Sequence, residues 1–237
     1  MTPGTIRPGP RLFRRGNHVA RRSFLAALVG ALLVSAALAV GAGGPVTAAE
    51  LVAAADQQRP LDLVKVSVAR VLTILRAQPA GTQLTSTQSA EVRRVADDFF
   101  DFDEMARRTL ANHWRDLSPR EQSEFTALFI DVLEQSYLTV IRRHSVTAVT
   151  FQGEIVTGSL AQVRSRIITD RQVELLIEYR LLQSGGRWQA YDVVADGVSL
   201  LSSYRSQFNT IIQASSFAQL LTRLRTREAH VLPAQRP

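Results

Sequence analysis

Residues 160–195, with the sequence LAQVRSRIITDRQVELLIEYRLLQSGGRWQAYDVVA, decide the fold. In the middle of this stretch, apolar Leu175, Ile177 and Tyr179 alternate with positions that are mostly charged. Such alternation is typical of a strand with one buried and one solvated face. The strand with this alternation is one of four predicted strands, over 146–152, 160–169, 172–183 and 188–195. The short connectors between them exclude the long crossovers of a parallel sheet, so we predict a four-stranded antiparallel sheet.

Helices are predicted on both sides of this sheet in the sequence. Residues 60–78 carry apolar residues at helical spacing. Ser118-Pro119-Arg120-Glu121 has the residues of a capping box, which predicts the start of a long amphipathic helix over 119–143. Further helices are expected over 89–98, over 101–115 and from 198 onward. The order predicts an α+β fold with the helices packed on one face of the sheet.

The first 48 residues have the layout of an export signal. Six arginines precede an uncharged apolar run at 24–40, and small residues follow the run up to Ala48 and Ala49. No acidic residue occurs before the end of the run, which is typical of a secretory signal. We expect cleavage after Ala48 or Ala49, a periplasmic location, and a single domain over 49–237. Arg21-Arg22 fits the twin-arginine route as well as general export, and a membrane anchor is the rival interpretation of the apolar run.

Charge and residue content exclude several classes of protein. The formal charge of +7 comes mostly from the six arginines of the signal, so the remainder lacks the basic excess of a nucleic-acid binder. The absence of cysteine excludes disulfides, thiolate metal sites and cysteine nucleophiles. The histidine spacing predicts no metal site, and no cofactor is expected. Ser199 is expected to cap a helix, while Asp192 and Asp196 are candidates for general acid–base catalysis.

Two blocks of the sequence carry more specific motifs. The first contains Phe100-Asp101-Phe102, Met105, Leu110, Trp114-Arg115, Gln122, Phe125, Phe129 and Tyr137. The second contains Trp188, Tyr191-Asp192-Val193, Gly197-Val198-Ser199-Leu200, Tyr204-Arg205, Gln207-Phe208 and Ile211-Ile212, at the spacing WxxYDVxxxGVSLxxxYRxQFxxII. Over about residues 50–227, the chain resembles the MlaC, or toluene-tolerance, family of periplasmic lipid-binding proteins. It departs from the family pattern at Ala111, where glycine is usual, and at Ser123, where arginine is usual.

The resemblance implies a soluble, non-enzymatic carrier of phospholipid. Such a carrier shuttles the lipid between an outer-membrane lipoprotein complex and an inner-membrane ABC transporter, and so maintains outer-membrane lipid asymmetry. It also implies an architecture that is NTF2-like in outline, built around an apolar cavity for two acyl chains. Three alternatives stay open: a carrier of a hopanoid or other polycyclic lipid, a non-catalytic envelope-complex subunit, and an enzyme using Asp192 and Asp196.

The spacing of apolar residues along the long helix and the strands indicates which side chains could form the cavity walls. The candidates on the long helix are Phe125, Leu128, Phe129, Leu133, Tyr137 and Ile141, and those on the sheet are Val163, Ile167, Leu175, Ile177 and Tyr179. Full packing of these residues against one another is the alternative interpretation. Arg115 and Arg205 are candidates for the phosphate at the mouth, and the alternative roles are satisfying buried carbonyls or pairing with Asp192.

Overall fold

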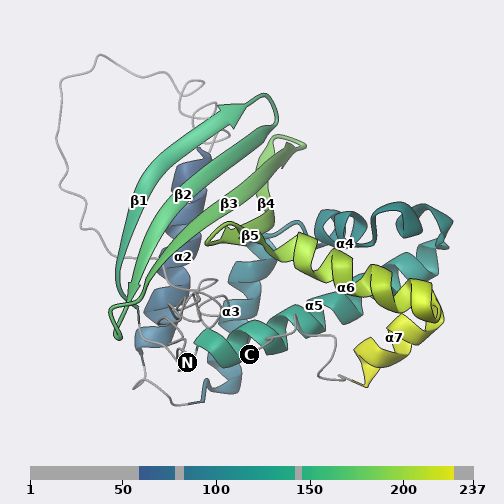
Figure 1. Cartoon of the computed structure of the whole chain (residues 1–237). Coiled ribbons are helices and arrows are strands. Elements are labelled where there is room, and N and C mark those ends of the chain that lie inside the picture. The colour runs from purple at the N-terminus through teal and green to yellow at the C-terminus, as the bar shows by residue number, and fades with distance from the viewer. Residues whose placement is uncertain (1–58, 78–82, 142–145, 227–237) are drawn as a thin grey trace, which may run out of the picture.

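The computed structural model describes residues 59–77, 83–141 and 146–226, with the backbone alone for 137–141 (Figure 1). The expected signal segment, residues 1–48, lies outside the described residues. The helices are α2 (Pro60–Arg76), α3 (Ser86–Phe99), α4 (Phe102–Leu110), the 3-10 helix η1 (Ala111–Asp116), α5 (Pro119–Ile141), α6 (Leu200–Ala214) and α7 (Phe217–Arg225). The strands are β1 (Val146–Thr157), β2 (Leu160–Thr169), β3 (Glu174–Ser184), β4 (Arg187–Ala195) and β5 (Val198–Ser199). The predicted α+β class is confirmed.

The strands form an antiparallel meander in the order β1-β2-β3-β4-β5. Two features differ from the sequence-based prediction. β1 extends past 152 to Thr157, because Gly153, with φ +118°, allows a bulge that lets pairing with β2 continue. The two-residue β5 adds a fifth strand just before α6.

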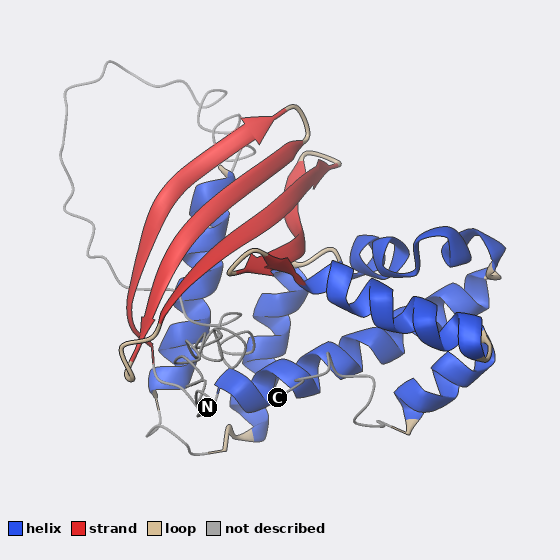
Figure 2. Cartoon of the chain, in the orientation of Figure 1, coloured by secondary structure: helices blue, strands red, loops and turns tan. Residues whose placement is uncertain are grey.

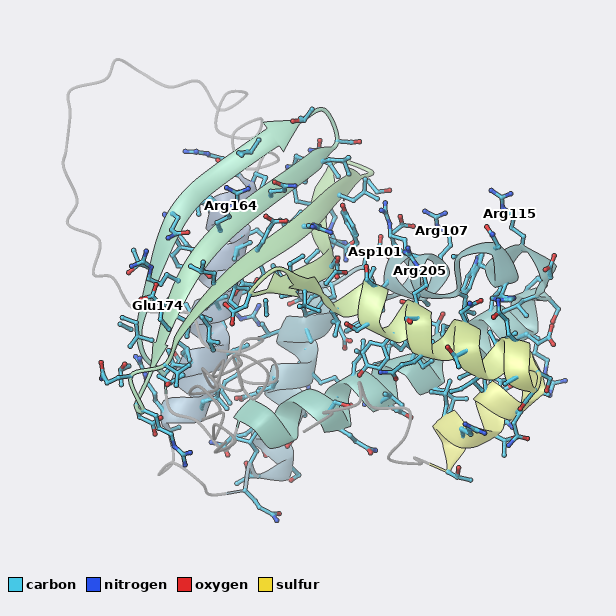
Figure 3. The ribbon with its side chains drawn as sticks, viewed as in Figure 1. Asp101, Arg107, Arg115, Arg164, Glu174 and Arg205 are labelled. Carbon is cyan, nitrogen blue, oxygen red and sulfur yellow. The ribbon has the colours of Figure 1, made fainter. Side chains whose placement is uncertain are left out.

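The two faces of the sheet differ as the alternation predicted. On β2 and β3 every second residue is buried, including Val163, Ile167 and Leu175, each fully buried. The opposite face carries ion pairs between neighbouring strands, such as Arg166–Glu174 at 2.9 Å. Figure 3 shows Arg164 and Glu174 on this outer face. The sheet therefore buries one face and leaves the other to solvent.

Helices cover the buried face of the sheet and also form a second group beside it. Figure 2 shows α2 and α3 behind the curved sheet and α4 to α7 gathered next to it. The described core accordingly consists of two clusters of buried residues. A sheet cluster joins α2 and the end of α3 to the strands, and a helical cluster joins α4, α5, α6 and α7. Phe100, between α3 and α4, packs against both clusters.

Capping residues fix the helix starts. At α5 the Ser118 amide donates to the Glu121 carboxylate at 2.9 Å and the Glu121 amide donates to Ser118 Oγ at 3.3 Å, so the predicted capping box is confirmed. α3 has an equivalent box between Thr85 and Gln88, and it begins three residues earlier than predicted. Asp101 caps α4 by accepting from the Glu104 amide at 2.9 Å.

The predicted continuous helix over 101–115 is wrong. α4 ends at Leu110, and Ala111 has φ +52° and ψ −115°, a conformation outside the helical region. The chain continues as η1, where Gln122 Nε2 donates to the Trp114 carbonyl at 3.0 Å and His113 Nε2 contacts Asn209 Oδ1 at 3.0 Å. The break lets this segment turn toward the start of α5.

None of the helices within 59–77, 83–141 and 146–226 is long and apolar enough to cross a membrane.

Candidate functional site

A cavity of about 130 Å³ lies where the two hydrophobic clusters meet. The sheet cluster contributes Val68, Phe99 and Tyr179 to its walls, and the helical cluster contributes Met105, Leu133 and Leu200. The space lies at the boundary between the two clusters. The cavity is therefore bordered on two sides by different parts of the core.

Helix α3 provides the largest share of the lining. Its residues Val92, Val95, Ala96 and Phe99 face the cavity, and their spacing places them on one side of the helix. α2 adds Ser67, Val68 and Val71, while α5 adds Ile130, Leu133 and Glu134. The α3–α4 junction is anchored to the sheet because the Asp101 amide donates to the Ala190 carbonyl at 2.9 Å. Phe100 and Phe102 at this junction complete the aromatic end of the cavity.

Tyr179 of β3 is the sheet's contribution to the cavity wall. Its ring meets Phe99 edge to face, with the ring centroids 6.0 Å apart. Burial raises the pKa of Tyr179 to about 12, and the nearby Ser165 hydroxyl opposes this rise. The phenol is therefore neutral at any physiological pH, and this wall of the cavity bears no charge.

Charged side chains among the lining residues gather at one place. Arg93 and Asp97 are the exposed members of the lining, and Glu134 is half-buried beside Arg93, so the cavity meets solvent at these three side chains, which we call its mouth. Arg93 Nη1 lies 2.9 Å from Glu134 Oε2, and Arg93 Nη2 lies 3.9 Å from Asp131 Oδ1. These ion pairs connect α3 to α5 across the mouth.

The structure distributes the predicted wall residues over three environments. Leu133 and Tyr179 line the cavity. Phe125 and Phe129 are fully buried in the helical cluster, where Phe129 meets Tyr204 edge to face at 5.3 Å, and Leu128 is partly buried against the same cluster. The predicted wall residues Val163, Ile167, Leu175 and Ile177 are buried in the sheet cluster. The side chains of Tyr137 and Ile141 lie outside the described residues. As lipid contacts, all eleven stay predictions.

The predicted head-group arginines lie on the helical group and are not among the lining residues of the described cavity. Arg115 is on η1 and Arg205 is on α6, and both are exposed (Figure 3). Arg205 Nε donates to the Arg108 carbonyl at 3.0 Å in an exposed contact, whereas the alternative role predicted from the sequence involved buried carbonyls. A head-group role for either residue stays a prediction.

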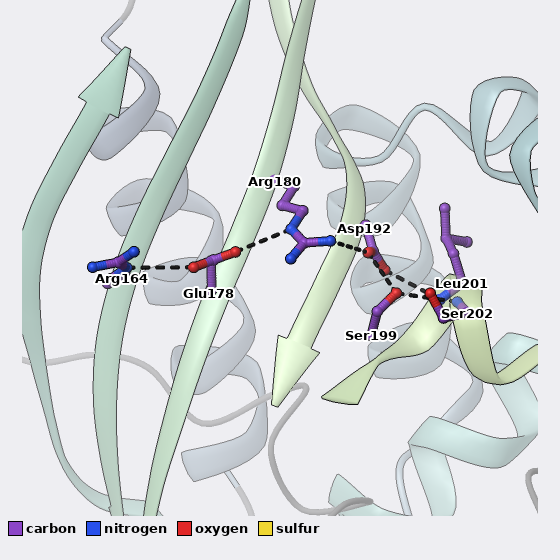
Figure 4. A network of polar contacts seen from close by, with 7 residues as sticks. All are labelled: Arg164, Glu178, Arg180, Asp192, Ser199, Leu201 and Ser202. Carbon is purple, nitrogen blue, oxygen red and sulfur yellow. Dashed lines mark hydrogen bonds and ion pairs between the residues drawn. The ribbon is translucent and has the colours of Figure 1, made fainter. Parts of the chain in front are cut away.

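Asp192 is the centre of a polar network that joins β4 to the start of α6 (Figure 4). The carboxylate, almost fully buried, accepts from Ser199 Oγ at 2.7 Å and from the Leu201 amide at 3.1 Å. Arg180 Nη1 lies 3.3 Å from it and also links to Glu178. Ser199 caps α6 by accepting from the Ser202 amide at 3.1 Å, as predicted.

Asp196, the other candidate for general acid–base catalysis, also accepts a hydrogen bond from a backbone amide. Asp196 Oδ1 accepts from the Leu176 amide at 3.0 Å, in the turn between β4 and β5. Asp192 and Asp196 therefore both hold the region of the YDV and GVSL motifs together. These contacts give the two carboxylates structural roles.

None of the lining residues on α2 and α3 was among the wall residues predicted from the sequence. The signals were present, because the Thr85–Gln88 capping box and the apolar spacing of 92, 95, 96 and 99 define an amphipathic helix with one buried face. The same reasoning could not identify which buried face borders a space, because that depends on how the two clusters meet.

The helices and the antiparallel sheet of this α+β fold line an apolar cavity with charges at its mouth. Such a cavity is typical of proteins that bind a largely apolar ligand. The chain belongs to the MlaC protein family, whose family model matches residues 65–226. The family resemblance of the two sequence blocks is thus confirmed.

The known proteins that are similar to this chain include one relative found by sequence and one solved structure. The intermembrane phospholipid transport system binding protein MlaC of Haemophilus influenzae is 23% identical over 122 residues, which cover 49% of this chain and 57% of that protein. The match therefore spans little more than half of that relative's length. A solved structure of a phospholipid-binding protein from Ralstonia solanacearum, in complex with a phospholipid, has a TM-score of 0.65 at 20% identity. It covers 73% of this chain and 99% of its own, and this likeness shows the fold.

Proposed function

We propose that this protein binds phospholipid in the cavity between α2, α3, α5 and the sheet. The observation that carries the proposal is an apolar cavity, placed within the MlaC fold, whose charged lining residues lie together at one end. Burying an acyl chain stabilises the complex by about 0.8 kcal/mol per CH₂ group. An apolar interior and a polar mouth suit a lipid whose chains are buried and whose head group stays near water.

The size of the cavity adds a requirement. Its volume of about 130 Å³ is smaller than the roughly 300–1,000 Å³ of ordinary ligand pockets, so its walls must separate when a phospholipid enters. The cavity lies between two clusters rather than inside one. Movement at this boundary would widen the space while most contacts within each cluster are kept.

The wider role we propose is that of a non-enzymatic periplasmic carrier. It would move phospholipid between an outer-membrane lipoprotein complex and an inner-membrane ABC transporter, and so maintain outer-membrane lipid asymmetry. Support comes from membership of the MlaC family and from the names of the similar proteins. Cleavage after Ala48 or Ala49 would release the carrier into the periplasm.

Native mass spectrometry of the protein, expressed from the full chain and isolated from the periplasm, tests the proposal. The expected spectrum shows the chain shortened at Ala48 or Ala49 and carrying the mass of one phospholipid, identified by fragmentation. A polycyclic lipid in its place would support the hopanoid alternative. A bare polypeptide that stays bare after incubation with phospholipid vesicles would contradict lipid binding.

Carrier activity needs a separate assay. Fluorescent phospholipid should move from donor to acceptor vesicles at a rate proportional to protein concentration, without chemical change to the lipid. Hydrolysis of the lipid would overturn the non-enzymatic role, and loading without transfer would restrict the protein to binding.

A further inference from the structure

The mouth of the cavity has an unequal charge balance. Arg93 is the basic lining residue, whereas Asp97 and Glu134 are acidic, and Asp131 lies 3.9 Å from the Arg93 guanidinium. Other lining residues of the described cavity are uncharged. Carboxylates therefore outnumber guanidinium groups where a lipid head group would come to rest.

Asp97 is the least engaged of these groups. It lies one helical turn after Arg93 on α3, so the two side chains share a face of the helix. Within the described residues its carboxylate makes no ion pair or hydrogen bond, while Glu134 is paired with Arg93 at 2.9 Å. Asp97 is thus an exposed carboxylate beside the opening, available to a cation.

We propose that the mouth recognises a zwitterionic phospholipid head group, an inference that rests on the proposed function. The Arg93 guanidinium meets the phosphate, because guanidinium groups pair well with phosphate oxygens. Asp97 and Glu134 meet the ammonium group, which lies a few atoms further along the same head group. An anionic head group would satisfy Arg93 but would meet repulsion from the carboxylates.

The effect is of moderate size because the charges are exposed to water. Pairs of exposed charges contribute about 0.2–1 kcal/mol, which corresponds to between about 1.4-fold and 5-fold in affinity. We expect about threefold preferential loading of phosphatidylethanolamine over phosphatidylglycerol at low salt. The preference should fall as salt approaches 1 M, where the screening length is about 3 Å.

Competition for loading tests the proposal directly. The periplasmic protein, stripped of lipid, is incubated with vesicles holding equal amounts of the two phospholipids with matched acyl chains, and the bound lipids are quantified by mass spectrometry. Asp97→Asn combined with Glu134→Gln should bring the ratio close to one. Arg93→Gln should lower the loading of both lipids. Glu174→Gln, an exposed acid on the outer face of the sheet, is the matched control and should keep the wild-type ratio.

The outcomes separate this inference from the function it rests on. Equal loading of the two lipids by the wild type, or a preference that the Asp97→Asn/Glu134→Gln variant keeps, would overturn head-group recognition and leave phospholipid binding intact. Failure of the wild type to load either lipid would overturn the proposed function, and this inference with it.

Discussion

At the scale of single residues, Ala111 explains one departure from the family pattern. Its φ of +52° and ψ of −115° suit glycine, the residue that the resemblance leads one to expect there. An alanine in such a conformation is strained by about 1–3 kcal/mol. A glycine at this position would adopt the same backbone conformation without that strain.

Ala111→Gly should therefore stabilise the protein. We expect a gain of about 1 kcal/mol, because relief of strain exceeds the extra entropy of glycine in the unfolded chain. The thermal midpoint should rise by about 2–4 °C, as measured by calorimetry. Ala106→Gly, the same change inside α4 at a fully buried position, should instead destabilise. Loss of stability at both positions would contradict the strain at Ala111.

Six predicted wall residues lie on α5, and the side chains of four of them are described. Among those four, Leu133 lines the cavity. Leu133→Trp should fill the space and reduce phospholipid loading several-fold, with a loss of stability of about 1–3 kcal/mol from overpacking. Leu133→Met conserves volume and should keep loading, at a cost below about 1.5 kcal/mol. Native mass spectrometry of both variants measures the loading. Full loading of Leu133→Trp would remove this residue from the lipid site.

At the scale of secondary-structure elements, α2 depends on a residue of the sheet for its first turn. Arg59, at its N-cap, makes no side-chain capping bond. The Leu61 amide instead donates to Glu154 Oε2 of β1 at 2.7 Å, and Arg59 Nε donates to Glu154 Oε1 at 3.0 Å. This contact fixes the start of a helix that forms one wall of the cavity.

Glu154→Ala should cost about 1 kcal/mol, as expected for the loss of a helix cap. Amide hydrogen exchange in the first turn of α2 should become faster than in the rest of the helix. Glu174→Ala removes only an exposed pair with Arg166, so it should change stability by less than about 0.5 kcal/mol. Equal effects of the two variants in chemical denaturation would contradict the capping role.

Helix α4 supplies a prediction about acid stability. Burial raises the pKa of Glu104, but hydrogen bonds from Arg107 and Arg108, at 2.7 Å and 2.6 Å, outweigh it and hold the pKa below its usual value of 4.5. Because the folded-state pKa is the lower one, this contribution to stability is present above pH 4.5 and is lost as the pH falls through the folded-state value.

Glu104→Gln should therefore destabilise the protein at pH 7 by up to about 1 kcal/mol, a magnitude limited by solvent screening. The difference from the wild type should shrink as the pH is lowered below 4.5. Chemical denaturation at a series of pH values measures it. A difference that stays constant from pH 7 to acid would show that the charge of Glu104 is not its cause.

At the scale of the whole molecule, periodicity and capping residues predicted most of the fold. The alternation in β3 and the box at Ser118 needed only local information. The break at Ala111 was missed because alanine favours helix and gives no sign of a positive φ. The continuation of β1 past Gly153 was missed because a glycine within a strand indicates either a turn or a bulge.

The site was less predictable for a different physical reason. Phe125, Phe129 and Leu133 lie on one apolar stripe of α5, yet the two phenylalanines pack against α6 while Leu133 borders the cavity. Amphipathic phase identifies a buried face but not whether that face meets atoms or space. The arrangement of the two clusters decides this, and it depends on contacts between distant parts of the chain.

The location of bound lipid tests the central claim most directly. A phospholipid with a diazirine on its acyl chain is loaded and irradiated, and the labelled peptides are mapped by mass spectrometry. Labels should fall on the cavity walls within residues 67–71, 92–99 and 130–133, and free unlabelled phospholipid should abolish them. Specific labelling confined to the outer face of the sheet, or to the α4–α6 surface near Arg115 and Arg205, would contradict binding in this cavity.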